Sequence, residues 1–486
     1  MAGIGVKLKK IYGKNTIVTD VIGAGYSVVI TIAPMFLVIG AVILMQFLLG
    51  VSKISYYDRE LYSSTVLYIF IFAMLTASPF NAVLSKYLSD IIYEEKYADI
   101  LPCYYLGLIM NLVYSVIPGV LFCIHEYGTG LVPLYYVATG FFGYMGLVFV
   151  FYSMLYLSIC KDYKKISLFF LVGMAVSVIM SLILDKFTGL DTCYGMLLSL
   201  TAGFVVIGSL EYALIRSYFR VSSGNYKAVF GYYRKNWRLV LTNFLYTLGM
   251  YVHNFVFWNT HLKLTVVDSF VCAPVYDMAT CLAMFTNITA SVIFISRVEM
   301  EFHEKYKSYS EAVIGGRGMD IRNSKSRMFE QLTDELMNIV RIQFIISIVL
   351  FFLCMFILPW LGMGGMVLMI YPCLTAGYFV LFIMYSAIIF LYYFNDQKGA
   401  LLTSFCFAAL TYACSVIATK LPVIWYGIGL VIGAFVGFSV AYMRLMKMEQ
   451  TLDVHIFCKG HLIKMAEGEK PSNKVYDRNS RKGDKV

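Results

Sequence analysis

Charged residues are scarce in this chain of 486 residues. Asp, Glu, Lys and Arg make up only 14% of it, whereas hydrophobic residues make up 60%. A soluble domain of this composition would expose large apolar patches to water, so the composition favours a protein embedded in a membrane. The first apolar run, between Asp20 and Lys53, holds no charged residue and exceeds the ~20 residues that a helix needs to cross the hydrocarbon core.

Motifs for catalysis, nucleotide binding and metal binding are missing as well. The sequence contains no Walker phosphate loop, no H-E-x-x-H and no G-x-S-x-G. Its 11 cysteines include no CxxC pair and mostly fall inside apolar runs, which is typical of reduced, buried cysteines. We therefore expect no enzyme activity, no catalytic residue, no cofactor and no metal. The net charge of +10 lies in loops beside apolar runs, so no nucleic-acid partner is expected.

Long apolar runs fill the rest of the chain. An unpaired backbone amide is too costly inside the hydrocarbon core, so these runs are expected to be helices. The expected spans lie near 20–49, 61–88, 100–124, 131–160, 165–184, 193–215, 237–259, 269–296, 336–358, 363–393, 399–418 and 422–443. The predicted fold class is all-α, a polytopic membrane protein of about 12 transmembrane helices.

Lysine and arginine are concentrated in every second connection between these spans. Of the 39 basic residues, 33 lie on one side together with both termini, and five lie on the other side. Basic residues are retained on the cytoplasmic side of membrane proteins. We therefore predict a multi-pass protein of the inner, cytoplasmic membrane with both termini in the cytoplasm.

The two longest connections divide the chain into six helices plus six. Two six-helix lobes around a central cleft are typical of transporters. We predict an N-terminal lobe over 1–215, a cytoplasmic linker over 216–236, a C-terminal lobe over 237–445 and a basic cytoplasmic tail, partly disordered, over 446–486. The second long cytoplasmic loop, 297–335, is predicted to form a helix, a turn and the start of span nine.

Ionisable residues at membrane depth are few, and two of them are expected to meet. His253 lies near the outer end of span seven, and Asp277 lies near the outer end of span eight. One interpretation is a proton-sensitive gate or a sugar-binding pair, because imidazole titrates near neutrality. The other is a static hydrogen bond that holds two helices together.

A second pair of ionisable residues lies near the cytoplasmic ends of the spans. Glu211 in span six and Arg341 in span nine are at comparable depth. They would either form an ion pair between the lobes, which could open and close with the cleft, or Arg341 would extend to the lipid headgroups. Both interpretations stay open.

Prolines and aromatic residues give a further guide to a transport path. Pro79 and Pro274 lie inside apolar runs and are flanked by Asn81, Tyr276 and Asp277. Carbonyls freed by proline beside polar side chains suit a cavity wall. Aromatic residues make up 16% of the chain and suit a carbohydrate path, although interface belts use many of them. The predicted path comprises Asp277, His253, Asn254, Tyr276, Pro274, Asn81, Glu211 and Arg341.

A series of short motifs runs in order through most of the chain. They are Met1-Ala2-Gly3-Ile4-Gly5 before a basic stretch, Pro79-Phe80, Lys86-Tyr87-Leu88-Ser89-Asp90, Tyr93 with Leu101-Pro102, Gly249 to Trp258, Pro274-Val275-Tyr276-Asp277, Arg297 with Glu299, Phe302, Tyr306 and Ile314-Gly315-Gly316. In these motifs the chain resembles the PelG family, a branch of the multidrug/oligosaccharidyl-lipid/polysaccharide exporter superfamily. The chain departs from the family at His253-Asn254, where the family tends to carry an acid and a lysine.

The resemblance implies export of a growing, GalNAc-rich Pel-type exopolysaccharide across the cytoplasmic membrane. It also implies a cytoplasmic glycosyltransferase and membrane subunits of the Pel synthase complex as partners, besides the polysaccharide and membrane lipids. The loop 297–335 is longer than a connection between two helices requires. We predict that its basic residues dock the glycosyltransferase: Arg317, Arg322, Lys325 and Arg327.

Three other functions remain as alternatives. The first is a flippase for a lipid-linked oligosaccharide, and the second is a cation-coupled antiporter, which the absence of an acid in span one makes less favourable. The third is a membrane scaffold that anchors a glycosyltransferase without transporting anything.

The distribution of basic residues makes the topology testable. Cysteines introduced at Ser222 and Ser324 should be protected from a membrane-impermeant thiol reagent in intact cells, because both lie in loops predicted to be cytoplasmic. A cysteine at Thr129 should be labelled, because that loop is predicted to face outward. Labelling at Ser324 from outside would overturn this orientation.

Overall fold

The computed structural model describes residues 17–51, 54–93, 96–159, 162–267, 269–293, 299–360 and 364–459. Over these ranges the chain is a bundle of helices with one small β-hairpin, so the predicted all-α class is confirmed. The motif Met1 to Gly5, Arg297 and the predicted tail beyond 459 lie outside the described residues.

Six long helices form the N-terminal half. They are α2 (Ile17–Leu48), α3 (Tyr56–Tyr93), α4 (Ile100–Thr129), α5 (Leu134–Ile159), α6 (Tyr163–Phe187) and α7 (Thr192–Tyr218), with a short 3-10 helix, η2 (Tyr97–Asp99), before α4. The helix α7 packs between α5 and α6, and α2 packs on α6. Most of their buried apolar side chains belong to one continuous core.

Six further long helices form the C-terminal half. They are α9 (Trp237–Phe257), α10 (Pro274–Ile293), α12 (Gly318–Trp360), α13 (Met366–Tyr393), α14 (Gln397–Ala418) and α15 (Ile428–Lys459), with η4 (Val423–Trp425) before α15. A second core lies here and is built largely on α13, which packs against α15 and α10. Nine of the helices in the described ranges are long and apolar enough to cross a membrane, as a multi-pass membrane protein requires.

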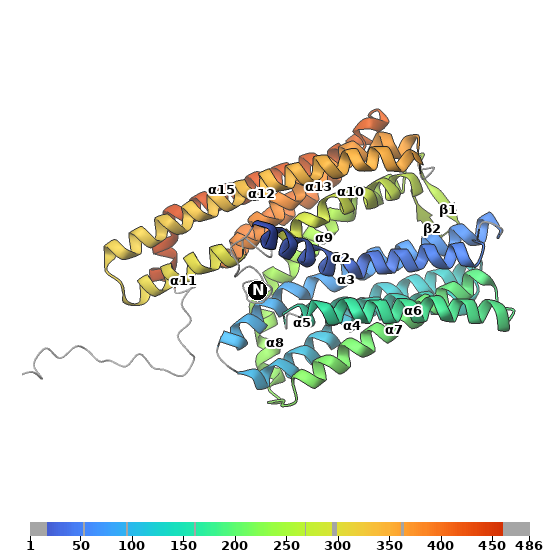
Figure 1. Cartoon of the computed structure of the whole chain (residues 1–486), viewed down its shortest axis with the longest axis horizontal. Helices are drawn as coiled ribbons and strands as arrows, with labels where there is room; N and C mark the ends of the chain where they lie inside the picture. Colours follow the sequence, from blue (N-terminus) through green and yellow to red (C-terminus); the bar gives the residue numbers. More distant parts are fainter. Residues whose placement is uncertain are drawn as a thin grey trace, which may run out of the picture.

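The remaining elements lie at the two ends of the bundle (Figure 1). The linker helix α8 (Tyr226–Lys235) and the helix α11 (Glu299–Gly315) lie at one end, and the hairpin of β1 (Leu264–Val266) and β2 (Phe270–Cys272) lies at the opposite end. In the predicted topology, α8 and α11 are cytoplasmic and the hairpin is outside. The second half of the linker packs on the N-terminal half, because Val229 and Tyr233 of α8 are buried in its core.

The predicted span 269–296 differs from the structure at its beginning. Residues 270–272 pair with 264–266 as antiparallel strands, and α10 begins only at Pro274. Alternating β-branched residues around a short polar turn favour a hairpin over a helix. Proline is well suited to the first position of a helix, because its nitrogen would have no partner inside the helix there.

Two helices extend beyond the predicted spans. The 43 residues of α12 give a length of ~64 Å at the α-helical rise, about twice the hydrocarbon thickness, so its first half extends out of the membrane. The helix α15 continues to Lys459 through the beginning of the predicted tail. It does so because Leu445, Met448 and Leu452 form one apolar stripe that is buried in the C-terminal core.

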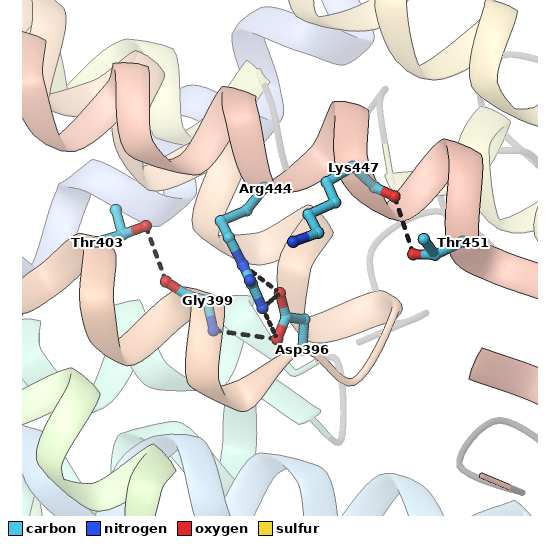
Figure 2. Close-up of polar contacts among 6 residues, drawn as sticks. All are labelled: Asp396, Gly399, Thr403, Arg444, Lys447 and Thr451. Carbon is cyan, nitrogen blue, oxygen red and sulfur yellow. Dashed lines mark hydrogen bonds and ion pairs between the residues drawn. The ribbon is translucent and has the colours of Figure 1, made fainter. Parts of the chain in front are cut away.

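An ion pair with a buried carboxylate joins the last two helices (Figure 2). Asp396 caps α14 by accepting a hydrogen bond from the Gly399 N–H at 3.0 Å. Its carboxylate also accepts from Nε and Nη2 of Arg444 on α15, at 2.8 to 3.0 Å. A carboxylate with a helix cap on one side and a guanidinium on the other has its charge fully compensated, so it can remain buried.

Candidate functional site

The two halves meet along two pairs of helices. The helix α3 packs on α9, and α2 packs on α10. Aromatic rings fill much of the α3–α9 contact. The rings of Tyr68 and Trp258 are stacked with centroids 5.3 Å apart and planes 8° from parallel, and Phe72 stacks on Phe255 at 6.1 Å. The interface between the lobes is therefore an aromatic seam.

The hairpin 264–272 crosses from the C-terminal half onto the N-terminal half. The Tyr68 hydroxyl donates to the Val271 carbonyl oxygen at 2.7 Å and accepts from the Val271 N–H at 2.8 Å. Ser269 Oγ donates to Oε2 of Glu126, at the end of α4, at 2.7 Å. Val266 and Phe270 belong to the N-terminal core. We call this hairpin with its contacts on α3 and α4 the hairpin latch.

The turn of the hairpin latch has an uncommon backbone conformation. Val267 has a φ of 54°, in the left-handed region that β-branched residues rarely occupy. Such a conformation costs about 1–3 kcal/mol and persists only when its surroundings hold it. Val267 is buried in the N-terminal core, which supplies that support.

Asp277 connects the aromatic seam to the start of α10. Its Oδ1 accepts from Asn254 Nδ2 at 2.7 Å, and both of its carboxylate oxygens accept from Trp258 Nε1 at 3.0 Å. Its Oδ2 also accepts from the Ala273 N–H at 2.9 Å, which satisfies a free donor at the helix N-terminus. Asp277 thus fixes the indole of Trp258, which in turn stacks on Tyr68 across the lobe interface.

The expected pair of His253 and Asp277 is not formed. His253 Nδ1 lies 2.9 Å from the hydroxyl of Tyr276, and no hydrogen bond to Asp277 is found among the described residues. The prediction was one residue out of register, since Asn254 makes the contact with Asp277. Consecutive residues of a helix point ~100° apart, so His253 faces a different side of α9. The hydrogen bond on which the expected gate was based is therefore not made between these two residues in this conformation.

The expected ion pair of Glu211 and Arg341 is also not formed in this conformation. Arg341 is exposed on α12, whereas Glu211 is completely buried in α7. Neither carboxylate oxygen of Glu211 has a hydrogen-bond partner. The two residues lie in different halves of the chain, on helices α7 and α12, which do not pack together in the described structure.

The two predicted proline sites differ from each other. Pro274 is the exposed first residue of α10, so it frees no carbonyl inside the helix. Pro79 lies inside α3, and the freed carbonyl of Leu75 accepts from Ser78 Oγ at 3.3 Å. Asn243 of α9 donates to the Ser78 carbonyl at 3.2 Å, which adds a polar contact to the lobe interface.

Asn81 and the predicted docking residues lie away from the stack of Tyr68 on Trp258. Asn81 is half-buried on α3, and its Oδ1 has no partner. Of the four predicted docking residues, Arg317, Arg322 and Arg327 are exposed on α12 or the turn before it, whereas Lys325 is half-buried and interacts within the chain. No cluster of metal-ligating side chains occurs in the part of the chain that the structure describes.

Two components of this site were not identified from the sequence. Tyr68 lies in an unbroken apolar run of α3, where nothing distinguishes it from a lipid-facing tyrosine. The sequence did contain an indication of the hairpin, because Leu264-Thr265-Val266 and Phe270-Val271-Cys272 lie on either side of the polar pair Asp268-Ser269 in the sequence. The hairpin was not recognised because its second strand continues into the apolar run that was predicted as a membrane span.

Asp277 should matter for stability through its four hydrogen bonds. Asp277→Ala leaves Trp258 Nε1 and the Ala273 N–H without acceptors, and Asn254 Nδ2 keeps only Thr280 Oγ1 at 3.3 Å. Each buried donor left unpaired costs about 1–3 kcal/mol. We expect a clearly lower melting temperature for detergent-purified Asp277→Ala and a smaller loss for Asp277→Asn, which keeps one acceptor. Asp334→Ala, an exposed acid on α12, should melt like the wild type. Asp277→Ala melting with the wild type would contradict the anchoring role.

Comparison with solved structures shows the fold. The chain resembles a multidrug resistance MATE family transporter of the MOP superfamily in its outward-facing conformation, with a TM-score of 0.56 and 14% identity over 87% of this chain and 96% of that one. The inward-facing conformation gives the same TM-score of 0.56, over 87% of this chain and 99% of that one. A MOP superfamily transporter from Pyrococcus furiosus gives 0.59, with 13% identity over 88% and 96%.

Sequence comparison gives the family. A search of curated proteins gave no match. The model of the PelG family, described as an exopolysaccharide exporter (EPS-E), matches residues 1–457. Because that match spans nearly the entire chain, the protein belongs to the PelG family.

Proposed function

We propose that this protein exports an exopolysaccharide from the cytoplasm to the outside along the seam between α3 and α9. Membership in the PelG family and the MATE-like fold support polysaccharide export or a flippase-type activity. The observation that carries the path is the stack of Tyr68 on Trp258 between the two lobes. The Pel-type, GalNAc-rich polymer is the substrate that we propose from the family.

The aromatic seam has the chemistry that a sugar chain needs. Sugar rings present C–H faces that pack on aromatic faces. In this conformation Tyr68 and Trp258 cover each other, and separation of the lobes would expose both faces to a passing chain. Because Asp277 holds the indole nitrogen, Trp258 would keep its orientation while the partner ring is replaced by sugar. Polar groups at Asn81, Asn254 and Tyr276 would bind hydroxyls along the way.

The hairpin latch is proposed to close the outer end of this path. It joins the lobes through a few hydrogen bonds and a small apolar patch. A neutral hydrogen bond contributes a net ~0.5–1.5 kcal/mol. Release of the latch therefore costs an amount that binding or pushing of a substrate can supply. Polymerisation by a partner glycosyltransferase would provide such a push.

The cytoplasmic extension of α11 and α12 is the proposed docking site for that glycosyltransferase. It projects at the end of the bundle opposite the hairpin (Figure 1), and both termini are proposed to lie on this side of the inner membrane. Arg317, Arg322 and Arg327 are exposed there. Membrane subunits of the Pel synthase complex would complete the assembly.

Charge reversal tests the docking surface. Replacing Arg317, Arg322 and Arg327 with Glu should reduce copurification of the glycosyltransferase several-fold, because three attractive contacts become repulsive. The matched control reverses Arg220, Lys227 and Arg234, three basic residues in and around α8, and should leave copurification unchanged. Equal retention of the partner by both variants would leave α12 without a docking role.

A native cysteine allows the hairpin latch to be locked. Ser64 Oγ on α3 lies 3.5 Å from Cys272 Sγ, so Ser64→Cys places two thiols within reach of a disulfide. Mild oxidation should form the bond and stop secretion of polymer, and a reductant should restore it. Mass spectrometry of the cross-linked peptide confirms the lock.

The control for this lock is Ser64→Cys combined with Cys272→Ser. It retains the new thiol but cannot form the bond, so oxidation should leave its export unchanged. If the cross-linked protein secretes polymer at the wild-type rate, the path does not require separation of the hairpin from α3.

A further inference from the structure

Among the residues whose burial the structure describes, one buried acid lacks the hydrogen-bond partners that the other buried acids have. Among the described residues, five acids are less than 9% exposed: Glu126, Glu211, Asp277, Glu335 and Asp396. Glu126 accepts from Ser269, Asp277 from Trp258, Glu335 from Gln331, and Asp396 from Arg444. Glu211 has 0% exposure, and neither of its oxygens has a partner.

A bare carboxylate is not compatible with this position. Removing an ionised carboxylate from water into a protein interior costs several kcal/mol unless donors or a cation compensate it. Arg216 lies five residues further along α7 but donates to the Tyr105 hydroxyl at 2.8 Å. The geometry is consistent with a neutral, protonated Glu211.

The neighbouring titratable groups are mostly tyrosines. Tyr104 of α4 packs on α7 beside Glu211, since its ring contacts that of Tyr212, the next residue, and its hydroxyl is 2.8 Å from Ser153 Oγ of α5. The Tyr104 ring also contacts Tyr156 of α5 at 4.7 Å and Tyr212 of α7 at 6.3 Å. The charged residues of α6, which packs on α7, lie only in its first and last turns: Lys164, Lys165, Asp185 and Lys186.

These tyrosines continue to the linker between the lobes. Tyr152 of α5 contacts Tyr104 and donates to its carbonyl oxygen at 3.2 Å. The hydroxyls of Tyr152 and of Tyr233 on α8 converge on Gly107, where a Cβ would lie 2.1 and 2.8 Å from them. A methyl group does not fit there, so the glycine creates the space in which α8 is seated. We call Tyr104, Tyr152, Tyr156 and Tyr233 the tyrosine cluster.

Helix α8 leads directly into α9, the helix that carries Trp258 at its end. It is held on the N-terminal half by Tyr233 and by the hydroxyl of Tyr232, which donates to Asp90 of α3 at 2.6 Å. A change of charge at Glu211 would therefore act on the segment that joins the two lobes.

We propose that Glu211 is a proton-binding site that is occupied in this conformation, and that the tyrosine cluster links its charge to the position of α8 and hence to the lobes. Glu211 lies seven residues before the end of α7 at Tyr218, about 10 Å along the helix, so its proton exchanges with the side where α8 and α11 lie. On release, the carboxyl O–H bond breaks and the proton passes to water. The remaining carboxylate then attracts water and the nearby hydroxyls.

Infrared spectroscopy of the purified protein tests proton binding without any transport. At neutral pH the wild type should show the carbonyl band of a protonated carboxyl, and Glu211→Gln should lose it. Glu126→Gln, which removes an equally buried but hydrogen-bonded acid, should not produce the same loss. An identical band in the wild type and Glu211→Gln overturns the proposal. Glu211→Asp retains a carboxyl group, so this second variant should keep the carbonyl band that Glu211→Gln loses.

Thermal stability gives an independent result. An acid that is protonated when folded and ionised when unfolded releases a proton on unfolding, so it destabilises the protein increasingly as the pH rises. The melting temperature of the wild type should fall from mildly acidic to alkaline pH, and that of Glu211→Gln should fall less. Equal slopes for the two proteins overturn the proposal.

The link to the lobes rests on the proposed function and is tested separately. In cells, polymer secretion by the wild type should vary with cytoplasmic pH, and Glu211→Gln should flatten this dependence. Loss of the infrared band with an unchanged pH profile of secretion would overturn the link and leave the proton site. Absence of secretion by the wild type would count against the proposed function and leave the infrared result unaffected.

Discussion

The apolar surroundings of this protein determine where its polar groups can lie. Inside a bilayer, a polar or charged side chain must have a partner, because no water is available to replace it. Asp277 and Asp396 follow this rule with three donors each, and each accepts from a side chain of another helix or its end. Asp277 also acts at the lobe interface, because it holds the indole of Trp258, which stacks on Tyr68. Glu211 is an exception to the rule, and for that reason it is informative.

The functional arrangement combines these anchors with aromatic rings. Asp277 orients Trp258, Trp258 stacks on Tyr68, and Tyr68 binds the backbone of the hairpin. Asp277 on α10 and Trp258 at the end of α9 belong to the C-terminal lobe, and Tyr68 on α3 belongs to the N-terminal lobe. The contact of Tyr68 with the hairpin then leads back to the C-terminal lobe. Loss of any one of them would loosen the outer end of the seam. The same contacts would be exchanged for sugar rings if the lobes separate.

The sequence was sufficient for the fold class and for most helices, because long apolar runs in a membrane protein have only one structural solution. Which polar residues face each other was harder to predict from the sequence. Depth along a helix can be counted, so His253 and Asp277 were correctly placed near the same end. Rotation about the helix axis cannot be counted when the start of the helix is unknown. The unrecognised hairpin and the start of α10 at Pro274 left Asn254, not His253, opposite Asp277.

The central claim is that the polymer passes along the seam between α3 and α9. A photo-crosslinking amino acid at Phe255, which lies half-buried in the seam beside Phe72, should capture glycan in cells that secrete polymer. The same group at Phe405 of α14, which is 56% exposed on the outer surface of the bundle, should capture none. Glycan attached at Phe255 alone is the predicted result. Glycan at both positions, or at neither while secretion continues, would contradict this path.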